Sequence, residues 1–264
     1  MRRGIVKTSE EIEVIGRGGV LLSRVLGKVA RHVHPGVTTA ELDEIAEKEI
    51  LKAGGKPAFK GYRITGVKQA YNSTVCTSVN DEVVHGLAHP GRVLKEGDII
   101  GLDIGMVYPA ADGFYTDMAM TVAVGIISDK AAKLMKVTRE CLERAISVVR
   151  AGAKLSDIGN AVQKHAEGNG YGVVRDLVGH GVGYAVHEEP RVPNYVDPDT
   201  RDMILKEGMV LAIEPMINAG TWEVFTADDG WTVKSADGSL SAHFENTIAV
   251  TKDGCEILTP FPVV

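Results

Sequence analysis

One short block of sequence occurs twice in this chain, and each copy ends in an acidic residue. Residues 94–103 read LKEGDIIGLD and residues 205–214 read LKEGMVLAIE, 111 positions apart. Asp103 and Glu214 each lie six residues after a glycine, at the end of an apolar run. The LKEG letters alone are an ordinary turn sequence. The matched positions of Asp103 and Glu214 indicate that the two halves of the chain fold alike. Where the halves meet, their acids would then lie close together.

A second acid follows each block in a further apolar run. Asp117 precedes MAMTVAVG and Glu245 precedes NTIAVTKDG. Each half therefore offers one acid late in a strand and another early in the following strand. No linker rich in Pro, Gly or Ser separates the halves, as a boundary between independent domains usually would. We predict one catalytic domain over 1–264, with pseudo-symmetric halves over about 1–125 and 126–264.

The composition excludes several classes of protein. Hydrophobic residues make up 44% and charged residues 24%, as in ordinary globular proteins. A net charge of −6 argues against nucleic-acid binding, which normally needs a basic surface. No apolar run approaches the roughly 18 residues that span a membrane, and MRRGIVKTSEEIEVI lacks the apolar stretch of a secretory signal. The three cysteines are widely spaced and match no disulfide or zinc-ribbon pattern, so a cytoplasmic location is expected.

Helix and strand signals follow the same order in both halves. Capping-box spacing after Thr8 and Thr38 predicts helices over about 9–33 and from 39 to a glycine stop at 54–55. Ser128 and Ser156 are expected to cap two more helices, which end near 151 and 168. The order predicts an α+β fold, with helices on one face of a mainly antiparallel sheet. Strands are predicted over about 75–79, 98–105, 115–124, 209–215, 222–226, 232–234 and 243–250.

The four acids are the candidate functional residues because apolar residues surround each of them. Burying an ionised carboxylate without a partner is costly, and no Lys or Arg lies near the acids within these runs. A bound cation is the compensation that this pattern favours. The alternative is that one or two of them are ordinary hydrogen-bonded acids at a turn or sheet edge.

Histidines extend the candidate site. His180 lies between glycines in GHGVG, which gives its backbone room for a close approach, while His187 begins HEEP and His85 lies in VVHG. Four carboxylates with one imidazole suit two divalent ions such as manganese, iron or cobalt, and also zinc. They do not suit a structural zinc, which prefers thiolates. Four of the remaining histidines are expected to be structural: His32, His34, His89 and His165. His243 lies two residues from Glu245 on the same strand face, which would suit support of a ligand, but it is not included in the predicted site.

In order along the chain, the motifs around these residues resemble those of type I methionine aminopeptidases. They are VNDEVVHG, GLDIG, YTDMAM, GHGVG followed by HEEP, AIEPM and SAHFENT, and the resemblance covers nearly the whole chain. It implies the pita-bread fold, a pseudo-twofold, curved and mainly antiparallel sheet with helices on one face. It also implies co-translational removal of the initiator methionine by means of two divalent metal ions.

The resemblance further implies a role for each metal ligand. Asp103 would bind one ion only, and Asp117 and Glu245 would bridge both. His180 and Glu214 would complete the shell of the second ion. Glu214 would also act as general base on the attacking water, a task that requires a nearby carboxylate.

Two histidines and an apolar wall would contact the substrate. By resemblance, His187 would contact the scissile carbonyl and its developing oxyanion, and His85 the scissile amide. The wall that would receive the methionine side chain matches or approximates that of the family: Phe59, Tyr62, Tyr71, Cys76 and Trp231.

The sequence departs from the family pattern around this wall. The stretch RITGVKQAYNSTV between Tyr62 and Cys76 is longer than usual, and Asn72 and Thr74 replace a proline and a serine. Val186 stands where many bacterial members carry a bulky aromatic residue. The metal ligands are all present, so these changes concern the shape of the pocket and the preference for the second substrate residue.

The expected substrates are nascent polypeptides that begin with Met followed by a small residue. A transient association with the ribosome and a monomeric state are also expected, without binding to nucleic acid or membrane. One alternative is an Xaa-Pro-type aminopeptidase, although those usually carry an added N-terminal domain and the helices here begin at about Ser9. The other is a non-catalytic binding protein of the same fold, although such relatives have typically lost metal ligands.

Overall fold

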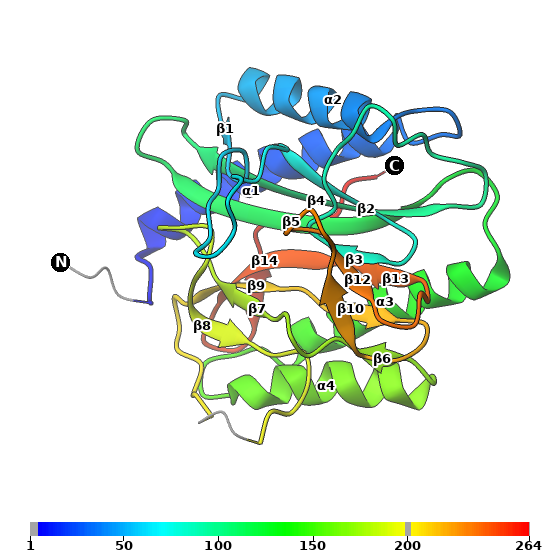
Figure 1. Cartoon of the computed structure of the whole chain (residues 1–264). Helices are drawn as coiled ribbons and strands as arrows, with labels where there is room; N and C mark the ends of the chain where they lie inside the picture. Colours follow the sequence, from blue (N-terminus) through cyan, green and yellow to red (C-terminus); the bar gives the residue numbers. More distant parts are fainter. Residues whose placement is uncertain (1–4, 199–201, 264) are drawn as a thin grey trace.

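A nine-stranded antiparallel sheet forms the centre of the molecule (Figure 1). The computed structural model describes residues 5–198 and 202–263. The sheet has the order β1-β4-β5-β14-β9-β7-β8, with β2 beside β4 and β15 beside β14. Its strands are β1 (Lys56–Pro57), β2 (Val75–Val79), β4 (Ile99–Tyr108), β5 (Phe114–Ala123), β7 (Gly179–Gly181), β8 (Glu188–Val192), β9 (Val210–Ile213), β14 (Glu245–Val250) and β15 (Cys255–Ile257).

Two small three-stranded sheets complete the β structure. One has the order β13-β10-β6 and the other β11-β12-β3. Their strands are β3 (Glu82–Val84), β6 (Gly172–Val173), β10 (Met216–Asn218), β11 (Val224–Thr226), β12 (Val233–Ser235) and β13 (Ser241–His243).

Two pairs of helices cover the outer face of the curved sheet, one pair over each half (Figure 1). They are α1 (Ser9–Ala30), α2 (Thr39–Lys52), α3 (Asp129–Ser147) and α4 (Leu155–Gly168). Helix α1 packs on β4 and β5, and α3 packs on β9, β10 and β13. This confirms the predicted α+β class and the pita-bread fold. Among the described residues, no helix is both long and apolar enough to cross a membrane.

Helix starts follow the predicted caps in three of the four cases. Thr8 Oγ1 accepts from the Glu11 N–H, and the Glu11 carboxylate accepts from the Thr8 N–H, so two amides at the helix start are paired. The prediction that Ser156 caps α4 is wrong. The helix begins at Leu155, the Asp157 carboxylate accepts from the Lys154 N–H, and Ser156 donates instead to Asp202.

The other differences concern element boundaries. Helix α1 ends at Ala30, before the predicted residue 33. The strand predicted over 243–250 is interrupted at Phe244, so that β13 pairs with β10 while β14 pairs with β5 and β9. The prediction also lacks seven short strands, each of five residues or fewer: β1, β3, β6, β7, β8, β10 and β15. β7 consists of Gly-His-Gly, and glycine is depleted in strands.

The register of the central strands brings the acids of the two halves together. Ala119 on β5 pairs with Asp103 on β4 and with Glu245 on β14, so these two acids flank the same residue. Asp117 lies two positions before Ala119 and therefore on the same face of β5. Ile213 pairs with Asn246, and the register continued by one residue places Glu214 beside Glu245.

Candidate functional site

The most compact cluster of potential metal ligands comes from three different strands. Ligand atoms of Asp117 on β5, His180 on β7 and Glu245 on β14 all lie within 4.8 Å of one another, and all three residues are buried. Carboxylates and an imidazole at such separations can share one cation. The antiparallel pairing of these strands, rather than a local loop, sets their positions.

Glu214 and Asp103 adjoin this cluster. His180 Nε2 lies 3.4 Å from Glu214 Oε1. Asp103 and Glu214 line the same cavity as Asp117, His180 and Glu245. The structure therefore gathers all five predicted ligands in one place.

Burial raises the pKa of all four acids, and the charges of neighbouring acids raise it further for Asp103, Asp117 and Glu245. Burial raises the pKa of Asp103 to about 6 and that of Glu214 to about 8. It also raises the pKa of Asp117, where the charge of Asp103 adds to the effect. The pKa of Glu245 rises well above its usual range for the same reasons, with Asp117 as the main charged neighbour. Without a cation the cluster therefore holds protons at neutral pH.

Unpaired oxygen atoms also indicate that the site can hold a cation. Asp103 Oδ1, Asp117 Oδ1 and Glu245 Oε1 are buried and have no hydrogen-bond partner in the described part of the chain. Buried carboxylate oxygens almost always have a partner. No Lys or Arg in the described residues forms an ion pair with these acids. Divalent ions would satisfy both the charge and the unpaired oxygens.

His180 is held in the tautomer that a metal ligand needs. Its Nδ1 lies 2.9 Å from the Gly181 carbonyl oxygen, which can only accept, so Nδ1 carries the proton and Nε2 keeps a free lone pair. Burial lowers the pKa of His180 to about 3, which keeps the ring neutral. The flanking glycines let β7 approach its neighbours, because a Cβ on Gly179 would lie 2.4 Å from the Ala212 oxygen.

His243 belongs to the site although it was placed outside it from the sequence. Its side chain is buried, and Nε2 lies 3.4 Å from Glu214 Oε2. Burial lowers its pKa, which keeps the ring neutral, and Nε2 has no hydrogen-bond partner among the described residues. Strand alternation alone predicts only that His243 lies on the same face as Glu245. Only the break at Phe244 and the pairing of β13 with β10 bring it to Glu214.

His187 and His85 line the same cavity as the acids. The His187 ring packs edge-on against His180 at 4.5 Å between centroids, and its Nδ1 lies 3.0 Å from the Tyr62 hydroxyl. Burial lowers the pKa of both histidines, that of His85 to about 4, so both are neutral at pH 7. His85 has a φ of 59°, an uncommon backbone conformation for a residue other than glycine.

The predicted apolar wall forms one cluster beside the acids. Its buried members pack together with Tyr62, and Tyr71 contacts the Trp231 ring edge-on at 5.3 Å. Cys76 pairs with Asp103 in the sheet, and burial raises the pKa of its thiol well above the usual range. The thiol therefore stays neutral and acts as an apolar surface. The buried members are Phe59, Tyr71, Cys76, Val186 and Trp231.

A buried ion pair holds the turn that carries His187. The Glu188 carboxylate accepts from Lys7 Nζ at 2.7 Å and from the backbone amides of Tyr184 and Ala185. The Lys7 side chain is 0% exposed and that of Glu188 is 14% exposed. Lys7 precedes α1, so the N-terminal segment fixes a turn that lies 181 residues away in sequence.

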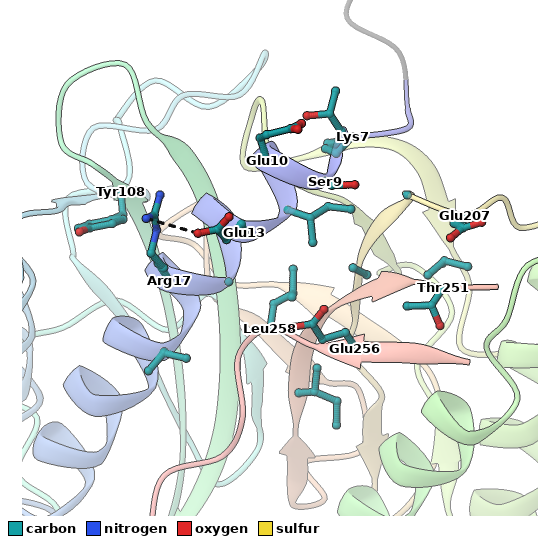
Figure 2. A pocket seen from close by; sticks show the side chains of 18 of the residues that line it. Lys7, Ser9, Glu10, Glu13, Arg17, Tyr108, Glu207, Thr251, Glu256 and Leu258 are labelled. Carbon is teal, nitrogen blue, oxygen red and sulfur yellow. Dashed lines mark ion pairs between the residues drawn. The ribbon is translucent and has the colours of Figure 1, made fainter. Parts of the chain in front are cut away.

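We expect Lys7→Met to destabilise the protein by about 3 kcal/mol, because it leaves a largely buried carboxylate without its cation. The melting temperature should fall by about 8 °C, and turnover should fall as the His187 turn loosens. Arg17→Met is the matched control, because the Arg17–Glu13 pair (Figure 2) is exposed by 60% and 71%. Loss of this exposed ion pair should lower the free energy of unfolding by less than about 1 kcal/mol. Equal melting temperatures for the two variants would refute the anchoring role.

The acids, histidines and apolar wall line one cavity of about 670 Å³. A larger depression of about 1040 Å³ lies between α1 and the β14–β15 hairpin, where Lys7, Glu13, Arg17 and Glu256 line it (Figure 2). Its lining includes no histidine and none of the buried acids described above. The candidate chemistry therefore belongs to the smaller cavity.

Comparison with known proteins agrees with this geometry. The profile of metallopeptidase family M24 matches residues 13–252. The methionine aminopeptidase of Clostridium acetobutylicum is 46% identical over 255 residues, which cover 97% of this chain and 98% of that protein. The crystal structure of methionine aminopeptidase from Thermotoga maritima superposes with a TM-score of 0.90 at 43% identity, covering 98% of this chain and 99% of that one.

A more distant structure shares the fold alone. The Xaa-Pro dipeptidase of Bacillus anthracis superposes with a TM-score of 0.77 at 23% identity. The match covers 98% of this chain but only 63% of that protein. The Xaa-Pro enzyme is therefore longer, whereas the matches to the two methionine aminopeptidases cover at least 97% of this chain and at least 98% of theirs.

Proposed function

This chain belongs to metallopeptidase family M24, among the type I methionine aminopeptidases, and we infer that it removes the N-terminal methionine from newly made proteins. The observation that carries this conclusion is that an apolar pocket and a cluster of buried acids line the same cavity. An apolar pocket lies directly beside buried acids that form no ion pair with Lys or Arg within residues 5–198 and 202–263. A pocket of that kind fits a thioether side chain, and the acids fit a hydrolytic metal site.

We propose that Asp103, Asp117, His180, Glu214 and Glu245 hold two divalent metal ions. When bound, such ions supply a nucleophile at neutral pH and stabilise the negative charge that develops during hydrolysis. The unpaired buried oxygens and the neutral His180 support this assignment. Manganese, iron, cobalt and zinc are all compatible with the ligand set, and availability selects among them.

We propose that Glu214 is the general base and that the neutral histidines act on the peptide bond. Glu214 lies between His180 and His243, so its carboxylate is held at the edge of the cluster, where it can take a proton from the attacking water. The Tyr62 hydroxyl can donate to His187 Nδ1, which would leave the ring proton on Nε2 for the developing oxyanion. His85 would contact the scissile amide.

The substrates are proposed to be nascent chains that begin with Met and a small residue. The crowded histidines beside the apolar pocket support a limit on the size of the second side chain. A monomer that works in the cytoplasm, with transient contact to the ribosome, is the setting we propose for this activity.

A peptide screen tests the proposed function. The manganese-loaded protein should release methionine from Met-Ala-Ser and Met-Gly-Ser at least about 100-fold faster than from Met-Leu-Ser. A Xaa-Pro control such as Ala-Pro-Ser should not be cleaved. Faster cleavage of Ala-Pro-Ser than of Met-Ala-Ser would favour the Xaa-Pro alternative and refute the proposal.

A further inference from the structure

A loop between two strands of the central sheet borders the cavity of the acids. Residues 63–70, here called the 63–70 loop, connect Tyr62 to Tyr71 between β1 and β2 (Figure 1, cyan). Two backbone hydrogen bonds clamp its ends: Gly61 N–H donates to the Tyr71 oxygen at 2.7 Å, and Tyr71 N–H donates to the Tyr62 oxygen at 2.8 Å. The loop therefore leaves the pocket wall and returns to it at the same place.

Contacts with the second half of the chain fix the far side of this loop. Trp231 Nε1 donates to the Gln69 carbonyl oxygen at 3.1 Å. Val67 packs against the apolar wall, and a Cβ added to Gly230 would meet its side chain at 3.4 Å. The 63–70 loop thus connects the first half of the chain to the hairpin that carries Trp231. These contacts fix the position of the loop at the edge of the cavity.

The side chain of Ile64 is exposed to solvent at the edge of the cavity. Ile64 lines the same cavity as the acids and is 44% exposed. The other apolar side chains that line the cavity, within the described residues, are buried or half-buried. An exposed isoleucine held at the mouth of a binding cavity offers a contact for a passing apolar group.

We propose that Ile64 is a specificity-determining residue that binds an apolar side chain at the third position of the substrate, an inference that rests on the proposed function. With methionine in the apolar wall, the second residue lies against His85 and His187, where only a small side chain fits. The third residue is then the first whose side chain can reach the rim. Burying about 40 Å² of apolar surface there corresponds to about fivefold in kcat/KM.

The test compares Met-Ala-Leu-Gly with Met-Ala-Ser-Gly, using the manganese-loaded protein. Wild type should favour the leucine peptide about fivefold, mainly through KM. Ile64→Ser should reduce that ratio to about one by slowing only the leucine peptide, whereas Ile64→Leu should keep it. Ile204→Ser is the matched control, because Ile204 is 50% exposed and does not line the cavity. This variant should keep the wild-type ratio.

The outcomes separate this inference from the proposed function. A wild-type ratio near one, or an unchanged ratio in Ile64→Ser, would overturn the role of Ile64 while methionine release itself continued. A preference for Met-Ala-Glu-Gly over both peptides would also overturn it and would point to the nearby cations Arg63 and Lys68 instead. If wild type cleaved neither peptide, the proposed function would fail, and this inference with it.

Discussion

Glu214→Gln is expected to lower kcat for Met-Ala-Ser by about 1000-fold, the scale of a lost general base. The amide keeps the size of the carboxylate but cannot take a proton from water at neutral pH. The amide also leaves a polar group of the same size beside His180 and His243, each 3.4 Å from the carboxylate, so the fold should be retained. Initial rates of methionine release, with circular dichroism as the check on folding, measure this effect.

A matched control comes from the same sequence block. Glu207 is exposed and lies outside the cavity of the acids, so Glu207→Gln should turn over at the wild-type rate. Retention of more than about a tenth of the activity by Glu214→Gln would contradict its assignment as general base. A loss of activity in both variants would indicate a general effect of charge rather than proton transfer.

The metal-free protein is expected to lose stability as the pH rises from 7 to 8.5. In the folded state, burial raises the pKa of Glu214 to about 8 and the pKa values of Asp117 and Glu245 well above their usual range. In the unfolded chain these groups are already ionised at pH 7. The folded state therefore holds more protons, and its stability falls by up to about 1.4 kcal/mol per pH unit for each such group.

Between pH 7 and 8.5 the histidines no longer oppose the effect of the acids on stability. His180 and His85 have folded pKa values lowered to about 3 and about 4, so they add stability as the pH rises, but only up to the unfolded value near 6.5. Above pH 7 the raised carboxyl groups dominate. The melting temperature of chelator-treated protein should fall by about 5 °C or more across this window.

Divalent ions should remove this pH dependence. Bound cations favour the ionised acids in the folded state, so no protons remain to be lost, and ion binding itself adds stability. Excess Mn²⁺ should therefore raise the melting temperature most at pH 8.5. A flat or rising melting temperature in the metal-free protein between pH 7 and 8.5 would contradict the electrostatics described for the four acids.

Much of the fold and the positions of the four acids could be predicted because their signals are local and periodic. Each acid ends or begins an apolar run, and antiparallel pairing with alternating faces is enough to bring Asp103 and Glu245 to the two sides of Ala119. Capping boxes marked the starts of α1 and α2 for the same reason. The order of the motifs along the chain also indicated the protein family, and the comparisons confirmed it.

What could not be predicted depends on contacts between distant segments. The buried Lys7–Glu188 pair joins residues 181 positions apart, and nothing in the local sequence around Lys7 marks it as buried. His243 reaches Glu214 only because the strand breaks at Phe244. The length of the 63–70 loop was visible in the sequence, but its attachment to Trp231 was not.

Methionine release from Met-Ala-Ser during titration of chelator-treated protein with Mn²⁺ is the most direct test of metal-dependent aminopeptidase activity. The metal-free protein should release no methionine, and activity should rise with added ion and saturate by about two equivalents, as a two-metal site requires. Calorimetry on the same samples should detect binding over the same range. Full turnover by the metal-free protein would contradict the central conclusion.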